Sequence, residues 1–136
     1  MITASKHRKL GQQGLTVSPI GLGCMGMSEF YGDTNDQESL KLLQQALKLG
    51  VNFFDTADVY GFGHNEKLLG EFIKTVPDRN SIILATKCGI VRDEHDSQKR
   101  GVDNSYDYII ACCEASLARL QTNIDLYYLH RTINDK

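Results

Sequence analysis

The chain has 136 residues, of which 41% are hydrophobic and 24% charged, and its formal net charge is -2. This length suffices for one domain with a buried core, and the composition is that of an ordinary globular protein. Basic residues are not clustered, so nucleic acid is not expected as a partner. No segment approaches the roughly 20 apolar residues of a membrane span, so no membrane association is expected.

The N-terminal segment and the cysteines indicate the compartment. The first residues, M-I-T-A-S-K-H-R-K, lack the apolar core of a signal peptide. Cys24, Cys88, Cys112 and Cys113 show no metal-type spacing, and the last two are neighbours within a helical pattern, so neither a metal site nor a disulfide framework is expected. These features predict a reduced, cytoplasmic protein.

The chain begins with a hairpin pattern and then alternates between strands and helices. Residues 8–18 predict the hairpin, because Gly11 and Gly14 frame a turn between short apolar segments. Strands are expected over residues 20–23, 51–55, 81–87 and 124–129, and helices over residues 36–49, 66–75 and 106–120. A long polar loop is expected over residues 88–104. This alternation predicts a parallel α/β architecture.

Particular residues are expected to begin and orient the helices. Asn35, Asn65 and Ser105 stand at the positions of N-terminal caps, and Gly50 follows the first helix. The helical spacing of the third helix predicts that its inward face carries Ile109, Cys113, Leu117 and Leu120.

Three of the predicted strands end on polar residues of different chemistry. Asp55, Lys87 and His130 each stand where an apolar segment stops, and Tyr60 follows in the loop after Asp55. The carboxyl ends of parallel strands lie at one edge of a sheet, so these side chains are expected to converge.

An acid, a phenol, an amine and an imidazole in one pocket have a definite chemistry. A lysine ammonium beside a phenol stabilises the phenolate, so Lys87 would make Tyr60 a usable proton donor to an oxygen that gains negative charge. Asp55 would orient Lys87, and His130 could donate a hydrogen bond to the same oxygen. The set predicts carbonyl reduction with hydride from a bound cofactor.

Each residue also has a purely structural interpretation. Asp55 and Lys87 could form an ion pair at the sheet end, His130 could be a satisfied strand-end histidine, and Tyr60 could be loop packing. Each structural interpretation is the better one taken singly, whereas the four together favour a site, because such groups cluster at functional sites.

The segment after residue 20 contains one misleading motif. Gly21, Gly23 and Gly26 spell G-x-G-x-x-G, but no helix opens directly from them and no acidic residue follows at the required distance, so a dinucleotide fingerprint is not favoured. The glycines are expected to allow a close approach of the backbone. Nearby, Met25, Met27, Phe30 and Tyr31 could line a pocket or only pack the loop, and His64 is expected near a helix start rather than in catalysis.

Motifs along most of the chain resemble the aldo-keto reductase family. They are L-G-x-x-G-L-x-V-S, G-L-G-C-M-G-M-S, N-F-F-D-T-A-D-V-Y-G, N-E-K-L-L-G, A-T-K, S-L-A-R-L and I-D-L-Y-Y-L-H-R, spread over residues 8–131. The segment G-C-M-G-M-S resembles the perakine reductase-like branch of plant, fungal and bacterial reductases.

The resemblance implies a (β/α)8 barrel that uses NADPH to reduce a small-molecule carbonyl substrate. The family's catalytic tetrad falls on Asp55, Tyr60, Lys87 and His130, with Tyr60 as the general acid. The resemblance also implies that Gly23, Cys24 and Met25 lie beside the nicotinamide ribose, and it adds Asp55 to the cofactor-binding residues.

A barrel of eight strands needs about 250 residues, so residues 1–136 are expected to form the N-terminal half of one barrel domain. Its inner face would carry Ile20, Phe53, Ile83 and Leu126. Two alternatives to a reductase remain: a regulatory, cofactor-binding member of the fold with little turnover, and an inactive half-barrel. A half-barrel would have to associate with itself or with a missing C-terminal half.

Overall fold

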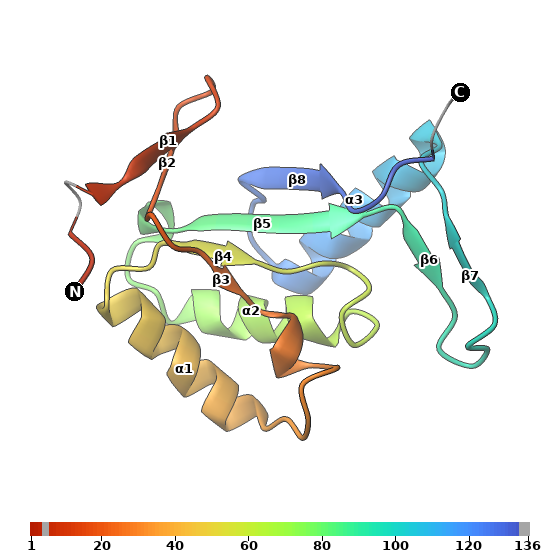
Figure 1. The fold of residues 1–136 in the computed structure, drawn as a ribbon, viewed down its shortest axis with the longest axis horizontal. Coiled ribbons are helices and arrows are strands. Elements are labelled where there is room, and N and C mark those ends of the chain that lie inside the picture. Colours follow the sequence, from red (N-terminus) through yellow and green to blue (C-terminus); the bar gives the residue numbers. More distant parts are fainter. Residues whose placement is uncertain (4–5, 134–136) are drawn as a thin grey trace.

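The computed structural model describes residues 1–3 and 6–133, and it is built around a four-stranded parallel sheet (Figure 1). Its strands are β3 (Leu22–Gly23), β4 (Phe53–Asp55), β5 (Ile83–Cys88) and β8 (Leu126–Leu129), and they pair in that order. Each strand is joined to the next by a connection that contains a helix, as parallel pairing requires. The predicted parallel α/β architecture is confirmed.

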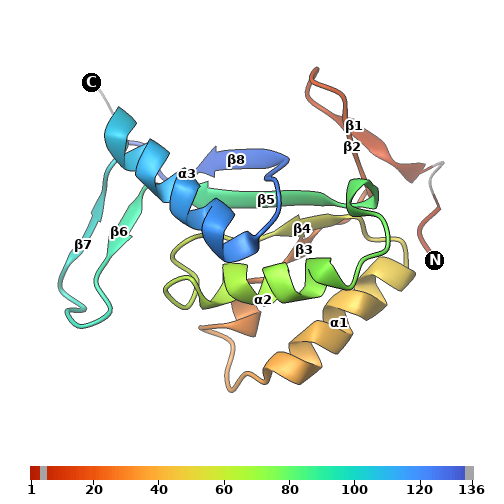
Figure 2. The ribbon, with the colours of Figure 1, turned by 180° about the vertical axis from the view of Figure 1, so that it is seen from behind.

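Three helices cover one face of the sheet: α1 (Asp36–Lys48), α2 (His64–Lys74) and α3 (Tyr106–Leu120) (Figures 1 and 2). On this face Phe54 and Leu84 are fully buried, and the rings of Phe54 and Phe72 pack with centroids 5.2 Å apart. The helices contribute the apolar side chains Leu43, Leu69, Phe72, Ile73 and Leu120 to the same core. Burial of these side chains between helices and sheet supplies the main stabilisation of the fold.

The opposite face of the sheet is less covered. Phe53, Ile83 and Leu126 are only half-buried there, in agreement with the expected inner face. Ile20 was expected among them, but it is 66% exposed, because the chain bends at this position and pairs only from Leu22 onward. Gly21 passes so close to the Phe53 ring that an added Cβ would lie 2.9 Å from it, which explains the glycine.

Two hairpins lie at opposite ends of the sheet (Figure 1). The expected hairpin, β1 (Arg8–Leu10) with β2 (Leu15–Val17), lies at the amino ends of the strands. At the carboxyl ends, the predicted loop over residues 88–104 instead contains a second hairpin, β6 (Ile90–Arg92) with β7 (Arg100–Val102). These strands, Ile-Val-Arg and Arg-Gly-Val, are only three residues long, which is too short to show the alternation by which strands are predicted.

The helix starts agree with the sequence at two positions and differ at one. The Asn35 side chain accepts the amide of Glu38, and Ser105 precedes α3 without a side-chain cap. Asn65, which was expected to cap the second helix, instead lies inside α2, whose cap position is Gly63 in a left-handed conformation. The Asn65 side chain is buried and bonded to other segments, so it is not available as a cap.

The inward face of α3 also departs from the prediction at one residue. Leu120 is buried as expected, but Leu117 is 39% exposed and Ser116 is fully buried in its place. Arg119 donates a hydrogen bond to the Ser116 hydroxyl, 3.3 Å away, and a second one to the buried carboxylate of Glu66, 2.6 Å away. The inward face of α3 thus includes a buried serine in a polar contact with Arg119.

Among the described residues, no helix is long and apolar enough to cross a membrane. The same part of the chain contains no group of three ligating side chains placed to hold a metal ion.

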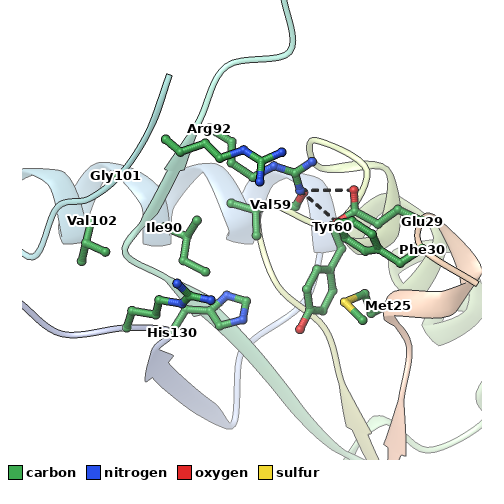
Figure 3. A pocket seen from close by; sticks show the side chains of 12 residues that line it. Met25, Glu29, Phe30, Val59, Tyr60, Ile90, Arg92, Gly101, Val102 and His130 are labelled. Atoms are coloured by element: carbon green, nitrogen blue, oxygen red, sulfur yellow. Dashed lines mark hydrogen bonds and ion pairs between the residues drawn. The ribbon is translucent and has the colours of Figure 1, made fainter. Parts of the chain in front are cut away.

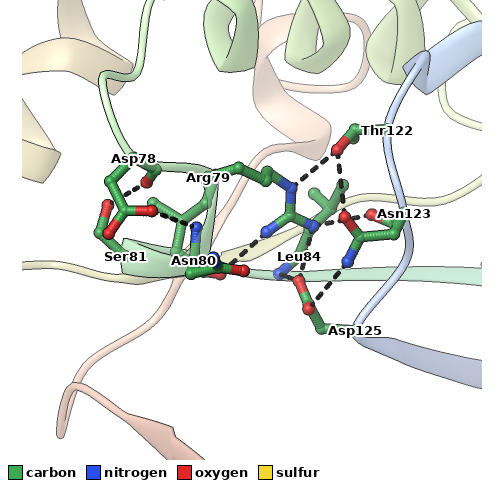
Figure 4. Close-up of polar contacts among 9 residues, drawn as sticks. Asp78, Arg79, Asn80, Ser81, Leu84, Thr122, Asn123 and Asp125 are labelled. Atoms are coloured by element: carbon green, nitrogen blue, oxygen red, sulfur yellow. Dashed lines mark hydrogen bonds and ion pairs between the residues drawn. The ribbon is translucent and has the colours of Figure 1, made fainter.

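The amino ends of β5 and β8 are joined by one guanidinium group (Figure 4). Arg79 donates to the Thr122 hydroxyl (2.8 Å), to the carbonyls of Ile82 and Asn123 (3.0 and 2.7 Å) and to the Asp125 carboxylate (2.7 Å). The same oxygen of Asp125 accepts the amide of Leu84, 2.8 Å away. The planar fork of arginine therefore links the two segments that lead into neighbouring strands.

This geometry predicts that Arg79→Lys destabilises the protein although the charge is kept. An ammonium group cannot reach four acceptors spread around a planar fork, so we expect a loss of about 1–3 kcal/mol in the free energy of unfolding. The measurement is urea denaturation. Arg8→Lys, at an exposed position of β1, is the matched control and should leave the free energy of unfolding unchanged; equal stability of both variants would contradict the assignment.

Candidate active site

Three polar side chains project from the carboxyl ends of neighbouring strands. Asp55 is the last residue of β4, Lys87 is the second-last residue of β5, and His130 directly follows β8. Asp55 pairs with Ala85 and Lys87 pairs with Tyr128, so parallel register places all of them at one edge of the sheet. The expected convergence at the strand ends is present.

The Lys87 ammonium is the centre of this group. It donates to the Asp55 carboxylate at 2.7 Å, to the carbonyl of Thr56 at 2.8 Å and to the Tyr60 hydroxyl at 3.2 Å. The Lys87 side chain is only 14% exposed, and that of Asp55 is 31% exposed. An ammonium has three N–H donors, so each of them has an acceptor, and one of these acceptors is the phenol.

Tyr60 lies in the loop that leads from β4 into α2. The residue is 9% exposed, its amide donates to the carbonyl of Ala57, and the Lys87 nitrogen lies 4.9 Å from the centre of its ring. The ring is therefore held on one side by packing and on the other by a cation, with the hydroxyl directed at the ammonium.

His130 completes the cluster beside the phenol. The two rings meet edge to face with centroids 5.6 Å apart, and the His130 amide donates to the carbonyl of Cys88 at 2.7 Å. Burial, and then the positive charge of Lys87, lowers the pKa of His130 below its usual value. The neutral imidazole is therefore the dominant form at pH 7, and its Nδ1 atom is buried without a hydrogen-bond partner among the residues that the structure describes.

The segment expected beside a cofactor ribose divides into accessible and inaccessible residues. Gly23 is exposed, and an added Cβ would meet nothing within 4 Å. Cys24 is fully buried; its amide donates to the carbonyl of Asp55, and burial raises the pKa of its thiol to about 12. Met25 lines a pocket next to Tyr60. A side-chain contact between a ligand and Cys24 is thus excluded in this arrangement, whereas Gly23 and Met25 are accessible.

A buried asparagine holds this segment in place. The Asn65 amide nitrogen donates to the carbonyl of Cys24 and to the Ser28 hydroxyl, both at 2.8 Å, and its oxygen accepts from the Thr56 hydroxyl at 2.6 Å. Ser28 is bonded in turn to His64, 2.7 Å away. From the sequence, Asn65 was assigned to a helix cap, and this function was therefore missed. The available signal was the pair of polar residues Asn65 and Glu66 at the start of a helix, both of which are buried.

A pocket of about 430 Å³ opens in front of Tyr60 and His130 (Figure 3). The second hairpin forms one wall, and the loop after β3 forms another. The lining residues are Met25, Glu29, Phe30, Val59, Tyr60, Ile90, Arg92, Arg100, Gly101, Val102, His130 and Arg131.

The aromatic and methionine side chains after β3 lie in different environments. Met25 and Phe30 line this pocket, Met27 is buried in the core, and Tyr31 is 75% exposed. His64 is the first residue of α2, as expected from its position.

The Aldo/keto reductase family profile matches residues 19–136. The chain belongs to the aldo-keto reductase family. It is 44% identical over 125 residues to probable aldo-keto reductase 1 of Glycine max, covering 90% of this chain and 35% of that protein. It is 40% identical to an NADP(+) aldo-keto reductase of Schizosaccharomyces pombe, covering 91% of this chain and 36% of the relative.

Solved structures of aldo-keto reductases show the same architecture. The holo form of a Bacillus halodurans aldo-keto reductase superposes with a TM-score of 0.79 at 41% identity, covering 91% of this chain and 39% of that structure. The aldo-keto reductase chain thus spans between a third and two fifths of these relatives. Its parallel sheet and three helices are part of the (β/α)8 barrel of the family.

One carboxyl group near the site is predicted to reduce stability at neutral pH. In the described part of the chain, one buried oxygen of Asp58 has no hydrogen-bond partner, and burial, followed by the charge of Glu66, raises the pKa of this residue from 3.8 to about 6. Because the folded-state pKa lies above that of the unfolded chain, the stabilising contribution is complete below pH 3.8 and is lost as the pH rises through about 6.

Asp58→Asn should therefore stabilise the protein at pH 7 by about 1–2 kcal/mol, a figure reduced for partial exposure of the group. It should also lessen the decline in stability between pH 4 and pH 6. The measurement is thermal unfolding across this pH range, with Asp33→Asn, at an exposed carboxyl, as the control. A variant with the pH dependence of the unsubstituted protein would contradict the prediction.

Proposed function

We propose that the full-length protein is an NADPH-dependent reductase that converts aldehydes or ketones to alcohols, with Tyr60 as general acid. The observation that carries the proposal is the Lys87 ammonium, which contacts the Tyr60 hydroxyl at 3.2 Å and the Asp55 carboxylate at 2.7 Å. A phenol paired with an ammonium can release its proton to an oxygen that is gaining negative charge. Family membership supports oxidoreductase chemistry in general.

In the proposed reaction, the substrate carbonyl lies in the pocket in front of Tyr60 and His130. When bound, NADPH supplies the hydride to the carbonyl carbon. The Tyr60 hydroxyl donates its proton to the carbonyl oxygen, while Lys87 stabilises the phenolate that remains. Neutral His130 donates one N–H to the same oxygen and so orients the carbonyl. The Asp55 carboxylate holds the Lys87 ammonium directed at the phenol.

The described residues fit one end of the cofactor. The second carboxylate oxygen of Asp55 has no partner in the described chain, Gly23 is open to solvent, and Met25 borders the pocket. We propose that these three residues hold the nicotinamide ribose, with the backbone of Cys24 shaping the segment. The name of the Schizosaccharomyces pombe relative, which specifies NADP(+), supports the choice of cofactor.

A regulatory protein of the same fold, which binds the cofactor with little turnover, is the second candidate. It is less favoured, because a protein that only binds has no need of a phenol held against an ammonium at hydrogen-bonding distance. Reduction of an aldehyde by the full-length protein would distinguish the two. The cytoplasmic location and the absence of nucleic-acid or membrane partners remain predictions from the sequence.

The central prediction concerns Tyr60→Phe in the full-length enzyme. The substitution keeps the ring and removes the proton donor, so we expect kcat to fall by about 10²-fold or more. The Kd for NADPH should hardly change. The measurements are steady-state NADPH oxidation with an aldehyde and fluorescence titration with the cofactor.

Tyr106→Phe removes the same hydroxyl from a residue that is 78% exposed and is not among the residues that line the pocket. This control should keep the full rate. Near-normal turnover by Tyr60→Phe would rule out its assigned role.

A second prediction concerns residues 1–136 alone. In the described sheet, β3 and β8 each pair on one side only, and Phe53, Ile83 and Leu126 lack an opposite wall. We expect this polypeptide to associate with itself or to pair with its C-terminal half. We also expect it to bind NADPH far more weakly than the full-length protein, because barrel phosphate sites use the loops of the last strands.

The measurements are light scattering and fluorescence titration with NADPH on purified residues 1–136. A stable monomer that binds NADPH as tightly as the full-length protein would contradict the expectation.

A further inference from the structure

The pocket in front of Tyr60 carries an excess of positive charge. Three arginines line it, Arg92 from β6, Arg100 from β7 and Arg131 from the segment after β8, whereas the only carboxylate in its described lining is Glu29. Methionine, phenylalanine, isoleucine and valine side chains form the rest of the wall around these groups (Figure 3). The pocket is therefore apolar near the phenol and cationic at its rim.

Arg92 is a fixed part of this wall. It donates to both oxygens of Glu29, at 2.9 and 3.2 Å, and to the carbonyl of Val59 at 3.3 Å. Its guanidinium also lies 4.6 Å from the centre of the Phe62 ring. The charge of Arg92 is thus matched by Glu29, and its geometry is set by the loops on either side.

The positive charges of Arg100 and Arg131, in contrast, are not paired with a described carboxylate. Neither takes part in an ion pair in the part of the chain that the structure describes, and both are exposed. Arg100 uses its Nε to donate to the carbonyl of Ser97 at 3.2 Å, and neither of its terminal nitrogens donates to a described residue. Their charges therefore face the pocket without a counter-ion among residues 1–3 and 6–133.

The two free arginines are held in position by the same hairpin. Asn104 follows β7; its amide nitrogen donates to the carbonyl of Arg131 at 3.0 Å, and its oxygen accepts the amide of Ile133 at 3.0 Å. Asp103 donates its amide to the carbonyl of Gly89 at 2.9 Å and so closes the base of the hairpin. Arg131 also directly follows His130, so a group bound to it lies beside the proposed reaction site.

We propose that Arg100 and Arg131 bind an anionic group, a carboxylate or a phosphate, on the carbonyl substrate. This inference rests on the proposed reductase function and specifies its substrate class. A guanidinium offers parallel N–H donors that match two oxygens of either anion. The apolar wall of Met25, Phe30 and Ile90 holds the carbon chain, and the anion at the rim directs the carbonyl toward Tyr60 and His130.

The test compares matched substrates in the full-length enzyme. One pair is 4-formylbenzoate and benzaldehyde, and the other is glyceraldehyde 3-phosphate and glyceraldehyde. For at least one pair, we expect kcat/KM to favour the anionic member by about tenfold or more. Arg100→Gln and Arg131→Gln should each lower this preference severalfold, and added salt should lower it as well.

Lys99→Gln is the matched control, because it removes one positive charge next to Arg100 from a side chain that is 67% exposed and outside the pocket lining. It should keep the preference of the unsubstituted enzyme. No preference for the anion in either pair, or an equal loss in Lys99→Gln, would overturn the proposal.

A binding measurement separates this inference from the reductase function. Calorimetric titration with 4-formylbenzoate and with inorganic phosphate needs no turnover, and binding should weaken severalfold in Arg131→Gln. If the enzyme reduces neither aldehyde of a pair but binds the anion through these arginines, the proposed function fails and the anion site stands. Turnover of neutral aldehydes with anion binding unchanged in Arg131→Gln would support the reductase function and overturn the anion site.

Discussion

A lysine ammonium can be buried at the end of a strand only if all of its N–H groups find acceptors. Lys87 meets this requirement with the Asp55 carboxylate, the carbonyl of Thr56 and the Tyr60 hydroxyl. These acceptors come from the neighbouring strand and the loop that leaves it, so the ammonium fixes the path of that loop. The loop in turn carries the phenol. Satisfaction of one buried charge therefore also brings together an acid, an amine and a phenol.

Two buried polar residues at the start of α2 hold the loops around Lys87 and Tyr60 in place. Asn65 joins the loop after β3 to the loop after β4, and its neighbour Glu66 accepts from Thr86 of β5 and from Arg119 of α3, both at 2.6 Å. Both side chains are fully buried. Buried polar groups are tolerated when every member is bonded, and such networks specify one arrangement of the segments that they join. The positions of Gly23, Met25 and Tyr60 depend on these two residues.

The parts of this molecule that could be predicted from sequence are those governed by local patterns. The bounds of α3 and the start of α1 follow from helical periodicity and capping, and the order of the parallel strands follows from their alternation with helices. Asp55, Lys87 and His130 were expected to converge because parallel register leaves little choice. Their catalytic roles, in contrast, are argued from the chemistry of the side chains and from resemblance to the family, and they stay a prediction.

The features that could not be predicted depend on tertiary contacts. The strands of the second hairpin are only three residues long, and the hairpin is held by its base, where Asp103 bonds to Gly89 and Asn104 bonds to the segment after β8. Asn65 has the sequence context of a helix cap, and only its partners in two distant loops show its function. The exposure of Ile20 follows from a bend that no periodicity signals.

The proton-transfer groups and the substrate-binding groups proposed for the pocket stand on different parts of the fold. The groups proposed to transfer the proton, Tyr60 with Lys87, stand where the buried sheet and the hydrogen-bonded start of α2 meet. The groups proposed to select the substrate, Arg100 and Arg131, stand on a short hairpin and on the segment that it holds. Changes in such a hairpin leave the core packing intact, since it contributes no side chain to the main hydrophobic cluster. Substrate choice can therefore change in this architecture while the proton-transfer geometry is kept.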